Sequence, residues 1–288
     1  MFQRIFILLF CFSVILVSCT TERSLEVISP NNDIQVVFNL DIKGKPYYVV
    51  SFNEKQVIKK SYLGFDFQDG KSFFHNLEIL TSSVKTFNES WKMLWGEQED
   101  VVNHYNELKL ELQEKSALKR KLTIVFKVYN DGVGFRYEFP EQDNLKEVLI
   151  ANENTEFNLI EDYKTFWIPG DWDIYEHLYS TTKLSEIDAK SYIPKTNLAQ
   201  SYIPENSVNT PVTMVGEDGI HISFHEAALV DYAGMTLKVD TVNLNLKSSL
   251  VGSKNTSYKV KKTLPFHTPW RTIQITDNAP ELIASNLI

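Results

Sequence analysis

The stretch LTIVFKVYNDGVGFRYEF, residues 122–139, decides the fold class of this 288-residue chain. Apolar side chains recur at every second position from Leu122 to Val128, which is the period of a β-strand with one buried face. The turn-forming triplet NDG follows, and a second alternating run then continues to Phe139. Because a turn signal between two such runs is typical of a β-hairpin, we expect two antiparallel strands here.

Runs of the same kind, rich in β-branched and aromatic residues, recur along the chain at residues 34–40, 47–52, 62–67, 77–87, 101–112, 155–160, 212–215, 219–224, 235–239 and 272–275. Strands with turns at this spacing predict an all-β fold, a large antiparallel β-sandwich. One helix is expected after residue 279, with Pro280 in its first turn. Residues 184–208, which contain two SYIP copies, are expected to form a long loop.

Net charge and the spacing of motifs argue against several classes of function. The formal net charge is −8, and no run of Lys and Arg supplies the basic face that a nucleic-acid partner requires. The six histidines form no cluster with metal-ligand spacing, and a Ser nucleophile elbow and a phosphate-binding Gly loop are absent from the sequence.

The first residues predict export. Residues 5–17 are almost entirely apolar and too short for a comfortable membrane span, which indicates a signal peptide at 1–18. The sequence LVSC at 16–19 resembles a bacterial lipobox, so we expect Cys19 to carry lipid and a linker to follow over 19–28. The protein would then be lipid-anchored in the cell envelope, at the periplasm or outer membrane. The alternative is an ordinary secretory signal with an incidental cysteine. Cys11 is the only other cysteine, so no disulfide or thiol chemistry is expected.

The densest polar and aromatic segment is FWIPGDWDIYEHLY at 166–179. A sugar offers apolar C–H faces to aromatic rings and hydroxyl groups to carboxylates, so this composition is compatible with a sugar site. A second interpretation stays open, in which the aromatic residues lie at the edge of the core and the acids are solvated loop charges.

Six motifs in order resemble one known family, and they are SPN at 29–31, YNDGVGFRY at 129–137, YEHLY at 175–179, NTPVTM at 209–214, HEAALVDYAGM at 225–235 and TPWRTI at 268–273. The chain resembles the N-terminal domain of glycoside hydrolase family 97, the bacterial α-glucosidases and α-galactosidases. The resemblance implies a β-sandwich like that of galactose mutarotase at 29–276, packed against a (β/α)8 barrel and a small C-terminal β domain.

The resemblance also implies that the catalytic acid and the nucleophile or base lie in the barrel. Residues 277–288 would begin the connection to that barrel, and the chain would stop before it. We therefore expect a fragment of a glycoside hydrolase that is inactive alone, with neither catalytic carboxylate assignable in this chain.

Four site assignments follow from the resemblance. Glu176 matches a glutamate that reaches from the sandwich to a calcium ion shared with the barrel. Asn209, Thr210 and Pro211 match a stretch on the substrate side. Trp172, with Trp167, is a candidate for a sugar platform or for the barrel interface. Glu226 is interpreted as structural.

The leading hypothesis is the substrate- and calcium-site-contributing domain of an exo-acting α-glycosidase that hydrolyses oligosaccharides. The alternative is a stand-alone carbohydrate-binding or scaffold lipoprotein without catalysis. Mutarotase activity is disfavoured, because His225 and Glu226 are neighbours on a predicted strand and their side chains leave opposite faces.

Overall fold

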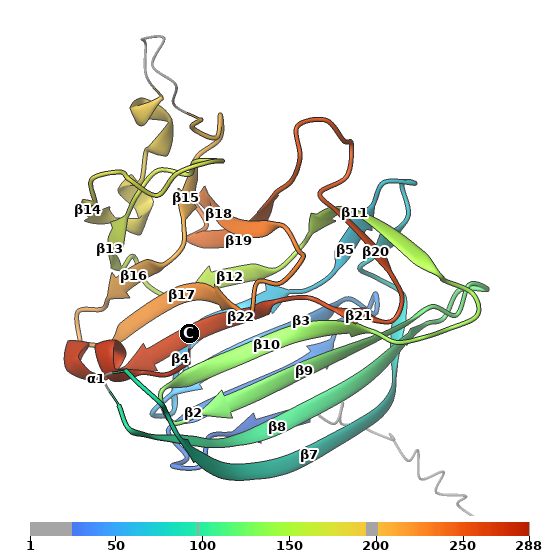
Figure 1. Ribbon diagram of the computed structural model, residues 1–288, viewed down its shortest axis with the longest axis horizontal. Coiled ribbons are helices and arrows are strands. Elements are labelled where there is room, and N and C mark those ends of the chain that lie inside the picture. Colours follow the sequence, from blue (N-terminus) through green and yellow to red (C-terminus); the bar gives the residue numbers. More distant parts are fainter. Residues whose placement is uncertain (1–24, 97, 194–200, 288) are drawn as a thin grey trace, which may run out of the picture.

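A computed structural model describes residues 25–96, 98–193 and 201–287 of the protein. Figure 1 shows a structure built almost entirely of antiparallel strands in stacked sheets, which confirms the predicted all-β class. Within these residues, no helix has the length and apolar character that crossing a membrane requires. The predicted signal peptide and Cys19 lie outside the described residues.

One large sheet contains eight strands, in the order β1 (Leu25–Ile28), β2 (Ile34–Leu40), β3 (Pro46–Phe52), β4 (Lys55–Tyr62), β12 (Glu156–Leu159), β19 (Asn245–Val251), β18 (Gly234–Asp240) and β15 (Ser207–Asn209). Its first strand pairs with β2 from Leu25 onward. The sandwich therefore starts inside the segment that the sequence analysis assigned to a linker.

The second large sheet forms the other layer, in the order β14 (Ser180–Lys183), β13 (Lys164–Trp167), β16 (Val212–Val215), β17 (His221–Ala227), β22 (Trp270–Thr276), β10 (Gly132–Phe139), β9 (Lys121–Tyr129), β8 (Asp100–Glu114) and β7 (Leu77–Lys92), with β21 (Phe266–His267) beside β10. The long β7–β8 hairpin forms one border of this sheet (Figure 1).

The predicted central hairpin is present as β9 and β10. Tyr129 pairs with Gly132, so Asn130 and Asp131 form the turn, as the NDG signal predicts. A Cβ atom at Gly132 would clash with the carbonyl oxygen of Ile273 on the neighbouring strand β22. Glycine is therefore required for the close approach of these two backbones.

A small third sheet closes one side of the sandwich, in the order β20 (Val260–Thr263), β11 (Glu147–Glu153), β5 (Phe65–Phe67) and β6 (Ser72–Phe73). The single strand predicted over 62–67 is wrong, because the chain leaves the eight-stranded sheet after Tyr62 and enters this one at Phe65. Gly64 lies at the break, where an added Cβ would meet the carbonyl oxygen of Phe73 at 2.8 Å.

Aromatic side chains join the two large sheets. Phe135 of β10 lies 5.2 Å, centroid to centroid, from Tyr48 of β3. Phe224 of β17 lies 5.0 Å from Phe157 of β12. All four residues are buried, so the alternating inward side chains form the core that the period-2 pattern predicts.

The predicted C-terminal helix is present as the short α1 (Ala279–Ala284), capped by the side chain of Asn278 and with Pro280 in its first turn. The segment 184–208 is more ordered than a plain loop. It contains two 3₁₀ turns, η1 (Leu184–Glu186) and η2 (Ala189–Tyr192), and ends in β15. Leu184, Ile187 and Ala189 are buried and anchor it to the core.

Candidate functional site

The polar and aromatic segment 166–179 begins in β13 and continues as a loop beside one edge of the ten-stranded sheet. Trp167, the last residue of β13, is only 2% exposed. Its indole N–H donates to Thr182 Oγ1 at 3.0 Å, and its ring packs edge-on against Tyr192. Trp167 is therefore a core residue, and its prediction as a sugar platform is wrong.

Asp171 organises the loop. Its side chain is completely buried, and its Oδ1 accepts hydrogen bonds from the backbone N–H of Asp173 (2.9 Å) and Ile174 (3.1 Å) and from Ser201 Oγ (2.5 Å). Burial acts to raise the pKa of Asp171, but these hydrogen bonds and that of His177 outweigh it and hold the pKa below its ordinary value of 3.8. The carboxylate is therefore charged and fixes the loop's first turn.

His177 closes the loop back onto Asp171. Its Nε2 lies 3.1 Å from Asp171 Oδ2, and because a carboxylate can only accept, Nε2 carries the proton and donates. The imidazole also lies 4.8 Å, centroid to centroid, from the ring of Tyr202, whose hydroxyl lies 3.4 Å from Nδ1. Residues 171–177 thus form a closed loop with a buried polar centre.

The second SYIP copy, residues 201–204, holds this loop from the outside. The N–H of Trp172 donates to Ser201 O at 3.0 Å, and the N–H of Ile203 donates to Gly170 O at 2.9 Å. The long segment that was expected to be a loop therefore pairs with the candidate site along its backbone.

Asn209 ties the loop to β15. Its side-chain Oδ1 accepts from the N–H of Asp171 at 3.1 Å, and its Nδ2 donates to Ile174 O at 3.2 Å. Asn209 is completely buried. The loop occupies both the oxygen and the nitrogen of this side-chain amide. The predicted role of Asn209 in sugar binding stays a prediction, and it would be indirect, through the position of the loop.

Thr210 and Pro211 follow Asn209 with a cis peptide bond between them. Thr210 is buried, and its Oγ1 lies 3.0 Å from Nδ1 of His225 on β17. Burial lowers the pKa of His225, so this imidazole is neutral at physiological pH. The predicted substrate contact of Thr210 and Pro211 stays a prediction.

Trp172 and Glu176 are exposed on the loop, as are Asp173 and Tyr175. The ammonium group of Lys254 lies 4.7 Å from the centroid of the Trp172 ring, a cation–π distance. In the described part of the chain, the Glu176 carboxylate makes no hydrogen bond or ion pair. It is therefore available as an oxygen ligand.

A complete metal site is not present among the described residues, since they contain no group of three His, Cys, Asp or Glu side chains arranged to hold an ion. Calcium requires six to eight oxygen ligands, of which Glu176 would supply one or two. The residues present fit the predicted calcium ion only as one contributor to a shared site.

Glu226 has a different environment from Glu176. Its Oε2 accepts from Arg271 Nη1 at 2.5 Å, and its Oε1 accepts from the N–H of Met235 at 2.9 Å. The same guanidinium binds Glu153 through Nε and Nη2, at 2.8 and 2.7 Å. This geometry supports the structural interpretation of Glu226, and it places Glu226 on the core face, opposite the face of His225.

Tyr175, the residue before Glu176, has a raised pKa although its side chain is more than half exposed. Burial raises the pKa of Tyr175, and the negative charge of Glu226 raises it further.

Sequence reasoning found the loop but missed its organising residues. The sequence leaves open whether Asp171 belongs to a sugar site or is a solvated loop charge, and it assigns no role to His177, Ser201 and Tyr202. The repeated SYIP was the available signal, because its second copy supplies Ser201 and Tyr202 to the loop.

The fold and the loop define a large antiparallel β-sandwich domain that carries a rigid polar and aromatic loop at one sheet edge. The chain belongs to the glycosyl-hydrolase 97 N-terminal domain family, whose model matches residues 27–288. The resemblance noted from the six motifs is thereby confirmed.

Individual relatives agree with this assignment. A retaining alpha-galactosidase of Bacteroides thetaiotaomicron is 20% identical over 96% of this chain and 43% of its own length. A family 97 enzyme from Pseudoalteromonas sp. strain K8, solved with acarbose, is 34% identical with a TM-score of 0.80, over 91% of this chain and 37% of its own. A beta-arabinopyranosidase gives 25% identity and a TM-score of 0.73, over 88% and 40% of the two chains. The chain therefore spans less than half the length of each of these relatives.

Proposed function

We propose that this chain is the N-terminal, substrate- and calcium-site-contributing domain of an exo-acting α-glycosidase that hydrolyses oligosaccharides. Family membership supports this proposal, as do relatives described as a retaining alpha-galactosidase and as enzymes in complex with acarbose and panose. The observation that carries it is the loop 171–177, which the buried Asp171 fixes through hydrogen bonds and which bears the exposed carboxylate of Glu176.

The chain's own residues would position ligands and leave the bond cleavage to a catalytic portion. Glycoside hydrolysis uses two carboxylates about 5 to 9.5 Å apart, and in this proposal both come from the (β/α)8 barrel of the longer protein. Asp171 and Asn209 would fix the loop, and Glu176 would offer its oxygens. A calcium ion held there would order carboxylates and sugar hydroxyl groups around itself.

The surface that meets the catalytic portion is proposed to be the tip of the β7–β8 hairpin with α1. Trp91, Met93, Leu94 and Trp95 are exposed at this tip, and Ile283 is exposed on α1. Such a contiguous apolar surface marks an interface more often than a solvated face. The hairpin and the C-terminal segment are already joined, since the Gln98 side chain hydrogen-bonds to Ala284 O and to Asn286.

The test is calcium titration of glycoside hydrolysis with this chain joined to the catalytic portion of a family 97 relative. We expect Glu176→Gln to raise the calcium concentration for half-maximal rate about tenfold or more, because it removes a charged ligand. Asp173→Asn is the matched control, since Asp173 is also an exposed loop carboxylate, and it should leave the midpoint unchanged.

Three results would count against the proposal. Equal midpoints for Glu176→Gln and the unchanged protein would remove the ligand assignment. Hydrolysis of nitrophenyl α-glucoside or α-galactoside by the 288-residue chain alone would show that the chain carries its own catalytic pair. Sugar binding by the isolated chain, with no response to any catalytic portion, would favour the carbohydrate-binding lipoprotein instead.

We also propose export and lipid anchoring through Cys19, on the basis of the lipobox-like LVSC. Cys19→Ala should move the protein from the membrane fraction to the soluble fraction. Intact mass should show the acyl groups on the unchanged protein, and an unmodified mature terminus at another residue would contradict the anchor.

A further inference from the structure

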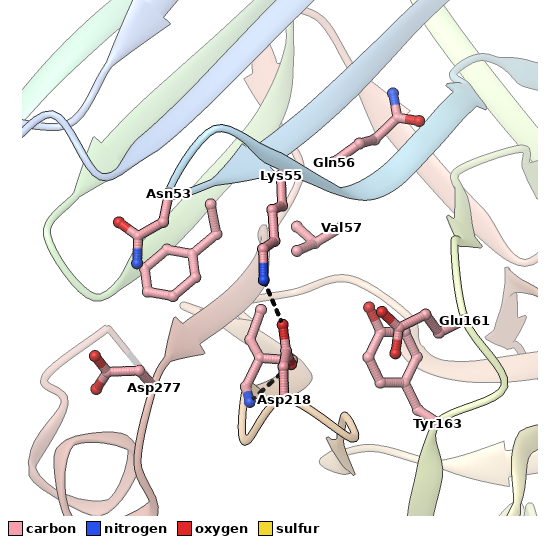
Figure 2. Close-up of a pocket in the computed structure, with 10 residues that line it drawn as sticks. Asn53, Lys55, Gln56, Val57, Glu161, Tyr163, Asp218 and Asp277 are labelled. Atoms are coloured by element: carbon pink, nitrogen blue, oxygen red, sulfur yellow. Dashed lines mark hydrogen bonds and ion pairs between the residues drawn. The ribbon is translucent and has the colours of Figure 1, made fainter.

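A second concave site lies at the opposite end of β13 from the 171–177 loop. It is a cavity of about 180 Å³ between the β3–β4 turn, the segment that precedes β13 and the β16–β17 turn. Figure 2 shows the side chains that line it, with the ion pair of Lys55 and Asp218 across the middle. Because β13 contains four residues, about 10 Å of strand separates this cavity from the start of the loop.

Tyr163 forms the buried wall of the cavity. It is only 2% exposed, and among the described residues its hydroxyl group makes no hydrogen bond. Its ring is fixed by Gly216, where an added Cβ would come within 3.1 Å of the Tyr163 Cε1 atom. The residue lines the cavity, so its hydroxyl group is placed to donate to a ligand there or to accept from it.

The charged groups of the cavity include both hydrogen-bond acceptors and a hydrogen-bond donor. Glu161, Asp218 and Asp277 supply acceptors, and Lys55 supplies a donor. Burial, together with the charges of Glu161 and Asp218, raises the pKa of Tyr163, so its hydroxyl group keeps its proton and can both donate and accept. Phe52, Val57 and Ile220 add an apolar wall.

This combination discriminates between classes of ligand. An anion would meet three carboxylates, and a small cation would meet the ammonium group of Lys55. A neutral ring with several hydroxyl groups can donate to the carboxylates, accept from Lys55 and Tyr163, and place C–H groups on the apolar wall. A volume of 180 Å³ corresponds to about six water molecules at roughly 30 Å³ each, which suits one sugar ring and no longer chain.

The geometry points to a second carbohydrate-binding site in this cavity, which takes a single neutral sugar ring against Tyr163 and Glu161. The site is separate from the 171–177 loop and does not depend on calcium or on a catalytic portion. It would hold one ring of an oligosaccharide while the rest of the sugar extends into solvent.

The test is a titration of the 288-residue chain with glucose, galactose and maltose, followed by saturation-transfer NMR and by calorimetry. Tyr163→Phe removes one hydroxyl group and keeps the ring that packs against Gly216, and we expect it to weaken binding at least fivefold. Glu161→Gln should also weaken binding, and Trp172→Ala, in the other loop, should leave it unchanged. Melting temperatures of the three variants control for loss of fold.

Each other outcome overturns the site. Undetectable binding of all three sugars at 50 mM, on the order of weak monosaccharide affinity, would exclude it. Loss of binding in Trp172→Ala with full binding in Tyr163→Phe would place the sugar at the loop. Binding of spermidine in place of the sugars, weakened by salt, would show a cation site instead.

Discussion

Arg271 and Glu153 form a bidentate ion pair in which neither side chain is exposed to solvent. The arginine lies on β22 of the ten-stranded sheet, and the glutamate ends β11 of the small third sheet. The pair therefore joins two sheets through the interior. Glu226 on β17 takes the remaining side of the guanidinium, so the positive charge is surrounded by two carboxylates.

Replacing Arg271 should destabilise the sandwich strongly. Arg271→Met leaves two buried carboxylates without their cation, and breaking a buried pair in this way costs about 3 to 5 kcal/mol. Urea unfolding of the isolated chain would measure the change. Arg136→Met is the matched control, because Arg136 pairs with Glu138 at a more exposed position and an exposed pair contributes about 0 to 1 kcal/mol. Equal losses of unfolding free energy in the two variants would show that the burial of the Arg271 pair does not increase its contribution to stability.

Glu226 should make stability depend on pH in a defined direction. Burial raises the pKa of Glu226 above its ordinary value of 4.5, and Arg271 lowers it by less. A carboxyl group with a raised pKa stabilises the fold most below about pH 4.5, its ordinary pKa. That contribution is lost as pH rises through the pKa that the group has in the folded state. The free energy of unfolding of the unchanged protein, minus that of Glu226→Gln, should therefore be larger at pH 4 than at pH 7. Urea midpoints at both pH values measure it, and an advantage that grows with pH would contradict the assignment.

Much of the sandwich could be predicted because the alternation of apolar side chains lies within each strand and the turn residues lie between strands. The β9–β10 hairpin alternates strictly and has NDG at its turn, so its register follows from local sequence. The strand β13 was not predicted, because its last two residues, Phe166 and Trp167, were assigned to the polar and aromatic segment 166–179. The break at Gly64 was not predicted either, because it depends on the carbonyl group of Phe73 in a different strand.

The site was predicted less well, because its contacts join distant parts of the chain. Arg271 is 118 residues from Glu153, and nothing local marks them as partners. Ser201 is 30 residues from the carboxylate of Asp171 that it binds. The interpretation of Glu226 as structural agrees with its hydrogen bonds to Arg271 and to the N–H of Met235.

Asp171 should give the opposite pH dependence to Glu226. Its pKa lies below 3.8, because the hydrogen bonds from Ser201, Asp173, Ile174 and His177 outweigh the effect of burial. A carboxyl group with a lowered pKa contributes stability above about pH 3.8, and the contribution is lost as pH falls through the folded value. Asp171→Asn should cost about 2 kcal/mol at pH 7, the size of hydrogen bonds to a charged group, and less near pH 3.

Amide hydrogen exchange gives the local readout of the same substitution. The N–H groups of Asp173 and Ile174, which donate to Asp171, should exchange faster in Asp171→Asn. Amides of the β9–β10 hairpin provide the internal control and should keep their protection. Unchanged exchange at both loop amides would show that the carboxylate does not hold the loop.

The tip of the β7–β8 hairpin should make the isolated chain self-associate. Leu94 is 99% exposed and Trp95 is 85% exposed, and Met93 and Ile283 extend the same apolar surface. Burial of apolar surface contributes about 25 cal/mol per Å², so two large side chains in solvent favour any contact that covers them. We expect the unchanged chain to bind a hydrophobic dye and to sediment partly as a dimer or larger species.

Substitutions at the tip test whether this particular surface, and not any exposed apolar side chain, causes the association. Leu94→Ser combined with Trp95→Ser should reduce both dye binding and association, and should leave the melting temperature nearly unchanged because neither side chain is packed in the core. Ile42→Ser is the matched control, since Ile42 is 96% exposed but lies alone in the β2–β3 turn. It should change neither property, because a single exposed apolar side chain is ordinary on a protein surface. A monodisperse monomer without dye binding, before any substitution, would remove the argument that this tip is a covered face in the longer protein.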